Sequence, residues 1–274
     1  MTERPAHFTA IDGGFQPTAY AHSHWGEDHL NGPAVVGLAA RALEQDHGSP
    51  EFQPARLTVD LCRAARGVTT TVITRLIRDG HRVRNAECDV LQAGLIVARG
   101  TLVCYRRSES PPGEEWCSTT EFSYPDGPLP GPDEFSGPYV ASERLGWTRT
   151  IAEHQNAERT RFLDRPIDVV AGEQNTPFVR AVMLAESTSL VTNVGTRGIG
   201  YINGDLTVGL ARMPEDDWIG TQADSHWTAD GIAVGTATLF DRRGPFGSGM
   251  VTAIANPAAQ IDFATTRFGG MRLQ

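Results

Sequence analysis

The pattern of apolar and polar positions predicts one long helix followed by several β-strands, and it does so twice along the chain. In the first half, apolar residues recur at helical spacing over residues 34–45, and Pro33 suits the first turn because its missing N–H costs nothing there. Alternating and β-branched runs predict the strands that follow, with Asp79-Gly80 as a tight hairpin turn. The predicted strands of this half are residues 57–62, 69–77, 83–91 and 95–105.

The second half repeats this order. Apolar spacing predicts a helix over residues 178–191, beginning after Pro177. The predicted strands of this half are residues 206–210, 218–227, 232–240 and 246–254. One further strand is expected before each helix, at residues 19–25 and 161–170.

Direct sequence similarity between the halves supports the same division. Arg56-Leu-Thr-Val-Asp-Leu-Cys-Arg63 matches Asp205-Leu-Thr-Val-Gly-Leu-Ala-Arg212 at an offset of 149 residues. Three other landmarks match in the same order at similar offsets: Asn31-Gly-Pro-Ala-Val35 with Asn175-Thr-Pro-Phe-Val179, Asp79-Gly80 with Asp230-Gly231, and Ala86 with Ala237. Ordered landmarks at nearly constant offset indicate a tandem repeat.

A proline-rich segment separates the two repeats. Residues 108–138 hold seven of the 17 prolines, and such a segment cannot enter a sheet interior. We therefore expect an N-terminal unit at residues 1–107, a linker at 108–138 and a C-terminal unit at 139–274. The predicted fold is α+β, a double hotdog of two tandem units in which an antiparallel sheet wraps one long helix. Pairing two such units into a continuous sheet removes two exposed edges.

Composition narrows the functional classes. The net charge of −9 argues against broad binding of nucleic acid, which needs clustered Lys and Arg. No apolar run approaches the ~18 residues of a membrane helix, and the first ten residues lack an apolar signal core, so we expect a cytoplasmic protein with no membrane span. The four cysteines show no C-x-x-C spacing, which favours free thiols over disulfides or zinc. No cofactor is expected.

With this order established, the sequence resembles the acyl-CoA thioesterase II-like family of double-hotdog proteins. The most specific match is Asn203-Gly-Asp-Leu-Thr-Val-Gly-Leu-Ala-Arg212 with Trp218 and Asp230-Gly231 after it, and Trp25, Asn31-Gly32-Pro33 and Gly244-Pro245 also fit. The resemblance implies hydrolysis of acyl-CoA by a water that an Asp, a Thr or Ser, and a Gln position. The matching positions are Asp205, Ser225, and Val251 or Thr252. Neither residue at the third position is Gln, and Thr252 is the polar candidate there.

Structural roles for the same residues stay open. Asp205 follows Asn203-Gly204 and suits a turn, and Ser225 suits an ordinary strand position. Asn31 suits a helix N-cap, while the N–H groups of Gly32 and Ala34 are candidate donors to an oxyanion.

Two local clusters of polar residues could indicate a catalytic triad or a metal site. Asp224 and His226 flank Ser225, but alternate strand residues face opposite sides of a sheet, so a local triad is not expected. His22, His24 and His29 are close in sequence; their spacing matches no established metal-ligand motif, and pocket-lining or surface roles are favoured over a metal site.

These observations lead to three functional hypotheses. The first is an acyl-CoA thioesterase acting in lipid metabolism as a homodimer or higher homo-oligomer. The second is a non-catalytic binder of acyl-CoA or acyl chains on the same fold, motivated by the missing Gln. The third, a hotdog hydratase or dehydratase, lacks the Asp/His pair that such enzymes usually carry near the helix.

Overall fold

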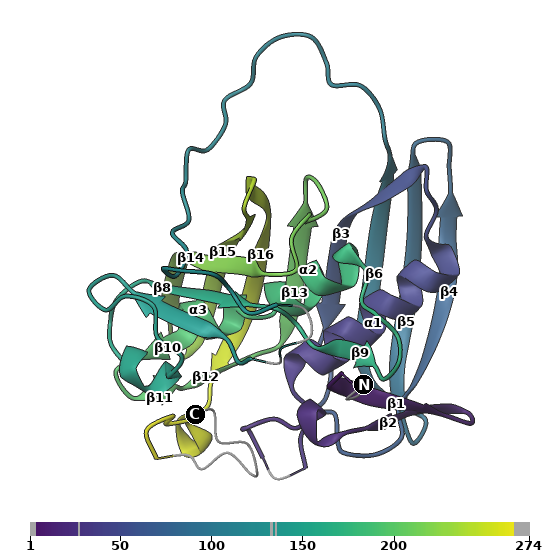
Figure 1. Cartoon of the computed structure of the whole chain (residues 1–274). Coiled ribbons are helices and arrows are strands. Elements are labelled where there is room, and N and C mark those ends of the chain that lie inside the picture. Colours follow the sequence, from purple (N-terminus) through teal and green to yellow (C-terminus); the bar gives the residue numbers. More distant parts are fainter. Residues whose placement is uncertain (1–3, 27, 132–133, 135, 266–274) are drawn as a thin grey trace.

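The computed structural model describes residues 4–26, 28–131, 134 and 136–265, and these form two sheet-and-helix units (Figure 1). The elements of the first half are β1 Ala6–Ile11, β2 Gly14–Pro17, a 3-10 turn Ala19–Ala21, α1 Gly32–His47, β3 Phe52–Asp60, β4 Thr71–Asp79, β5 Val83–Gln92 and β6 Leu95–Arg106. Those of the second half are β7 Tyr139–Ser142, a 3-10 turn Ile151–His154, β8 Thr160–Asp164, β9 Asp168–Val170, α2 Pro177–Ala185, α3 Thr188–Asn193, β10 Val194–Gly195, β11 Gly198–Ile199, β12 Tyr201–Asn203, β13 Asp205–Leu210, β14 Ile219–Ala229, β15 Ile232–Asp241, β16 Gly244–Ala255 and a 3-10 turn Pro257–Ala259. Among the described helices, none has the length and apolar character needed to cross a membrane.

One continuous sheet joins the two halves. Its strand order is β4-β5-β6-β3-β13-β16-β15-β14-β8-β7, with β12 paired to β16. At the centre, β3 and β13 pair antiparallel with Thr58 opposite Thr207, and their hydroxyl oxygens are 3.0 Å apart. These two threonines occupy the same position in the sequence repeat, so equivalent strands meet around a local pseudo-twofold axis.

The helices cover one face of this sheet. Helix α1 packs against β4, β5 and β6, and α3 packs against β14, β15 and β16 (Figure 1). The approach of α3 is close: a Cβ at Gly235 would lie 2.3 Å from Thr192 Oγ1, and one at Gly249 would lie 2.2 Å from Thr188 Oγ1. Alternate strand residues, such as Leu206 and Val208, are buried on this face, so their odd-numbered neighbours on β13 point to the opposite, outer face.

Three predicted elements differ from the structure. The strand expected at residues 19–25 is wrong: Thr18 accepts a hydrogen bond from Tyr20 N–H and caps a 3-10 turn there, while β1 takes the strand position by pairing parallel with β9. The strand expected at 161–170 is two strands, β8 and β9, divided around Pro166, which has no N–H for a ladder. The helix expected at 178–191 is interrupted between α2 and α3.

The segment between the units has no helix or strand among its described residues. Its first part runs as an arc outside both units (Figure 1). Its second part packs on the C-terminal unit, where the Phe122 ring stacks on Phe240 at 5.1 Å between centroids and Trp218 Nε1 donates to Pro130 O at 3.1 Å. The unit boundaries at 107 and 139 stay a prediction.

Candidate active site

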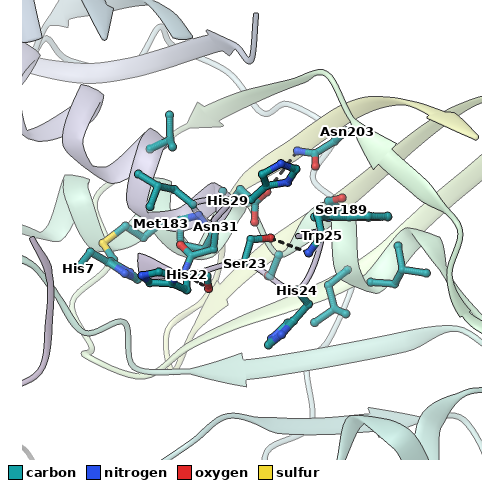
Figure 2. A pocket seen from close by; sticks show the side chains of 18 of the residues that line it. His7, His22, Ser23, His24, Trp25, His29, Asn31, Met183, Ser189 and Asn203 are labelled. Carbon is teal, nitrogen blue, oxygen red and sulfur yellow. Dashed lines mark hydrogen bonds between the residues drawn. The ribbon is translucent and has the colours of Figure 1, made fainter. Parts of the chain in front are cut away.

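A cavity of about 1290 Å³ lies where the two halves of the chain meet. It is bounded by the segment that enters α1, the loop after β3, the interruption between α2 and α3, and the turn between β12 and β13. Figure 2 shows side chains from these elements converging on it, including His22, Asn31 and Asn203.

The interruption of the second helix places a carboxyl group in this cavity. Ser187 Oγ donates to Leu184 O at 2.6 Å, a local bond that competes with the helical ladder. Ser187 N also donates to Leu184 O, at 2.9 Å, so the chain makes a tighter turn of three residues before α3 begins. Glu186 stands at this break and lines the cavity, next to Ser187 and Ser189.

The Glu186 side chain is partly buried and lines the cavity. Asn203 Nδ2 donates to its Oε1 at 3.2 Å, and burial raises the pKa of the Glu186 carboxyl from 4.5 to about 7. A Cβ at Gly32 would lie 1.9 Å from Glu186 Oε1, so the glycine makes room for the carboxyl. A carboxyl with this pKa is suited to accept a proton near neutral pH.

The N-terminus of α1 borders the same carboxyl, and two of the residues predicted there have structural partners. Asn31 Oδ1 accepts from Ala34 N at 2.9 Å, and Asn31 Nδ2 donates to Tyr20 O at 2.9 Å, so Asn31 is the helix N-cap. The Ala34 N–H is thereby occupied, and Ala34 is not among the described residues that line the cavity. Gly32 does line it, and within the described part of the chain no acceptor is found for its N–H.

The structure places Asp205, Ser225 and Thr252 away from the cavity lining, among the residues it describes. Asp205 Oδ1 accepts from Thr252 N at 2.8 Å, and Thr252 Oγ1 donates to Asp205 Oδ2. Ser225 Oγ is 2.7 Å from Thr236 Oγ1. These side chains lie on the outer face of the sheet, opposite the helices, as the burial of the alternate residues shows. The three side chains for which catalytic roles were predicted therefore do not line the cavity.

A one-residue irregularity explains why Asn203 reaches the cavity and Asp205 does not. Asn203 pairs with Ala253, whereas Thr207 pairs with Met250, so the register shifts by one residue around Gly204. Residues two apart on a regular strand face the same side, and a bulge reverses this relation. Sequence alternation alone could not reveal the reversal.

The position expected to hold Gln contributes no amide to the cavity. Val251 is fully buried on the helix-facing side of β16, and Thr252 points to the outer face. The side-chain amide that contacts a cavity carboxyl comes instead from Asn203 on β12.

Several histidines contribute to the cavity lining. His22, His24 and His29 all line it, and burial lowers the pKa of His24 and, together with Arg66, that of His29. The described residues contain no group of three or more His, Cys, Asp or Glu that could hold a metal ion. The position of His22, His24 and His29 in the cavity lining agrees with the pocket-lining role that the sequence favoured.

Comparisons with known proteins agree with this architecture. The family model described as "Acyl-CoA thioesterase N-terminal domain" matches residues 21–105, and "Acyl-CoA thioesterase C-terminal domain" matches residues 121–253. The chain belongs to the acyl-CoA thioesterase family. A search of curated proteins finds no match to this thioesterase-family chain.

Solved structures of low sequence identity share the hotdog fold. A hotdog-fold protein from Alicyclobacillus acidocaldarius is 18% identical, with a TM-score of 0.64 over 90% of this chain and 95% of that one. A tesB protein from Mycobacterium avium subsp. paratuberculosis is 14% identical, with a TM-score of 0.59 over 84% and 89%. The acyl-CoA thioesterase II TesB2 from Mycobacterium marinum is 14% identical, with a TM-score of 0.55 over 82% and 90%. These likenesses support the tandem hotdog architecture.

Glu186 was missed in the sequence, although a signal was present. Val179, Met183, Glu186 and Leu190 follow the helical spacing of a buried stripe, and Glu186 is the one charged member. Burying a carboxylate in the apolar stripe of a helix costs free energy, so a carboxylate at such a position usually has a specific role.

Proposed function

We propose that the protein hydrolyses the thioester bond of an acyl-CoA, with Glu186 as the general base. The observation that carries this proposal is the Glu186 carboxyl in the cavity, with a pKa raised to about 7 and Asn203 bound to one oxygen. Membership of the acyl-CoA thioesterase family supplies the reaction class.

The geometry supports a direct hydrolysis. Glu186 takes a proton from a water molecule that attacks the thioester carbonyl carbon. Asn203 holds the carboxyl in place, and the N–H of Gly32, at the positive end of the α1 dipole, stabilises the oxyanion that forms. When the tetrahedral intermediate collapses, the C–S bond breaks and the CoA thiolate leaves. The thiolate recovers the proton from Glu186.

The alternative function, a non-catalytic acyl-CoA binder, retains one supporting observation. The family resemblance leads one to expect Gln at position 251 or 252, and the chain has Val251 and Thr252 there. Asn203 supplies a side-chain amide that contacts the proposed base, Glu186, although the expected Gln is missing. Hydrolysis is therefore the better-supported function.

We also propose that the protein assembles as a homodimer or larger oligomer through the outer face of the sheet. Trp227 and Ile232 are 65% and 58% exposed on neighbouring strands of that face. Light scattering of the purified protein tests this: a mass of one chain at micromolar concentration would contradict it.

A thiol-release assay on three proteins tests the thioesterase proposal. Wild type, Glu186→Gln and Asp205→Asn are incubated with a panel of saturated acyl-CoAs and a thiol-reactive dye. We expect Glu186→Gln to lower kcat/KM by about 10²–10⁴-fold, the usual contribution of a general base, and Asp205→Asn to change it by less than about tenfold.

Two results would overturn the assignment. If no acyl-CoA of the panel releases thiol with wild type while binding is still detected by calorimetry, the protein is a binder. If Asp205→Asn abolishes release and Glu186→Gln does not, the outer-face residues predicted from the sequence carry the chemistry.

A further inference from the structure

A second polar region lines the cavity near residues 164–167, which also line it. Asp164 lines the cavity at the end of β8, and His7 and Ser136 line it from two other segments. None of these three residues takes part in the hydrolysis described above.

Packing brings the three segments to the same stretch of wall. Tyr139 pairs with Leu163, so the chain that enters β7 runs beside the chain that leaves β8. Arg149 Nη1 donates to Gly137 O at 2.8 Å, and Arg165 Nη1 donates to Pro130 O at 3.2 Å, which fixes the same segment there. On the other side, Ala6 of β1 pairs with Asp168 of β9. These pairings place the chain before Tyr139 beside the end of β8, and the β1 segment that carries His7 beside β9.

Each group has unused hydrogen-bonding capacity. Asp164 Oδ1 accepts from Arg165 N at 2.8 Å, and no further partner of its side chain is found in the described part of the chain. Ser136 Oγ is buried without a partner among the described residues. His7 Nδ1 lies 3.0 Å from Tyr20 O and donates to it, so Nε2 remains an acceptor.

The charge state of these groups disfavours an anionic ligand, because none of the three is a cation near neutral pH. Burial lowers the pKa of His7 to about 4, so its ring is uncharged near neutral pH, and burial raises the pKa of the Asp164 carboxyl to about 7. The cationic groups nearest Asp164, Arg149 and Arg165, are bound to backbone carbonyls and to Tyr139. A hydroxyl can donate to His7 or Asp164 and accept from Ser136.

Apolar side chains form the surroundings of this region, including Ile151, Phe162, Ile167 and Met183. An unsubstituted acyl chain would leave Ser136 Oγ, His7 Nε2 and the second Asp164 oxygen unpaired in an apolar cavity, which costs free energy. We propose that the cavity is built for an acyl chain that carries a hydroxyl group, which His7, Ser136 and Asp164 bind. This inference rests on the proposed thioesterase function, because it names the acyl group of that substrate.

The test measures binding of free acids, so that it does not depend on hydrolysis. Dodecanoic acid and a series of hydroxydodecanoic acids, with the hydroxyl at successive positions, are titrated into the wild-type protein by calorimetry. We expect one hydroxylated acid to bind about tenfold more tightly than dodecanoic acid, the value of one to two well-formed hydrogen bonds. Asp164→Leu should remove this preference, and Ser136→Ala, which deletes one oxygen only, should reduce it about threefold.

The outcomes separate this inference from the proposed function. If every hydroxylated acid binds no more tightly than dodecanoic acid, or if Ser136→Ala and Asp164→Leu both keep the preference, the inference is wrong even when acyl-CoA is hydrolysed. If the preference is present and sensitive to these variants but no thioester is cleaved, the inference stands and the thioesterase proposal fails.

Discussion

Replacing Glu186 with Gln tests the buried carboxyl through protein stability as well as through activity. Gln keeps the shape of the side chain and can still bond to Asn203, but it carries no charge at any pH. Glu186 is ionised in the native protein only above about pH 7, whereas in the unfolded chain it ionises near 4.5.

The sign of the effect follows from proton binding. Between about pH 4.5 and pH 7 the native state holds a proton that the unfolded state has lost, so rising pH destabilises the wild type relative to the unfolded chain. The difference between these pKa values corresponds to about 3 kcal/mol, and solvent contact through the cavity reduces this to roughly 1–3 kcal/mol. Because Gln does not ionise, Glu186→Gln does not lose this free energy of unfolding as the pH rises, and it should be more stable than wild type above about pH 7.

Thermal unfolding of wild type and Glu186→Gln at several pH values measures this difference. At about pH 4 the two proteins should unfold at nearly the same temperature, and at about pH 8 the variant should unfold roughly 2–10 °C higher. Glu109→Gln, in an exposed part of the interunit segment, is the matched control and should follow wild type at every pH. A Glu186→Gln variant that is less stable than wild type at pH 8, or whose advantage does not change with pH, would refute the buried-carboxyl description.

Three other predictions follow from the site and the core. Gly32→Ala should push the Glu186 carboxyl out of place and lower kcat/KM for acyl-CoA by at least about tenfold while KM changes little; unchanged kcat would show that the close approach does not matter. Asn31→Ala removes the N-cap of α1 and should cost about 1–2 kcal/mol in urea unfolding, and a loss below about 0.3 kcal/mol would contradict the capping role. Burial raises the pKa of the Cys88 thiol to about 12 and that of Cys104 to about 11, so mass spectrometry should show rapid alkylation of only the two exposed cysteines until the protein is unfolded; rapid alkylation of all four would contradict the packing of β5 and β6.

The sequence carried enough information for most of the framework. The repeat around Thr58 and Thr207 predicted two related units, and in the structure the same two residues face each other at the centre of the sheet. Period-two alternation and the Asp-Gly turns located most of the main strands to within about two residues, because one face of most of these strands is buried; β3 is the exception and begins earlier, at Phe52.

The site was harder to predict because it depends on two local irregularities. Ser187 interrupts a helix that apolar periodicity presents as continuous, and this interruption puts Glu186 in the cavity. The shift of register near Gly204 turns Asn203 inward and Asp205 outward, although strand alternation assigns both to one face. Neither feature has a period, so pattern analysis did not reveal them, and the family resemblance led to Asp205 instead.

The pH dependence of kcat/KM for acyl-CoA hydrolysis tests the central claim most directly. With Glu186 as the base, kcat/KM should rise about tenfold per pH unit below about pH 7 and level off above it, because only the ionised carboxyl accepts the proton from water. Asp164 has a similar pKa, so Asp164→Asn is measured beside the wild type and should keep the same break in the profile. A rate that is already on its plateau at about pH 5, or a break that disappears in Asp164→Asn, would contradict the assignment of Glu186 as the catalytic base.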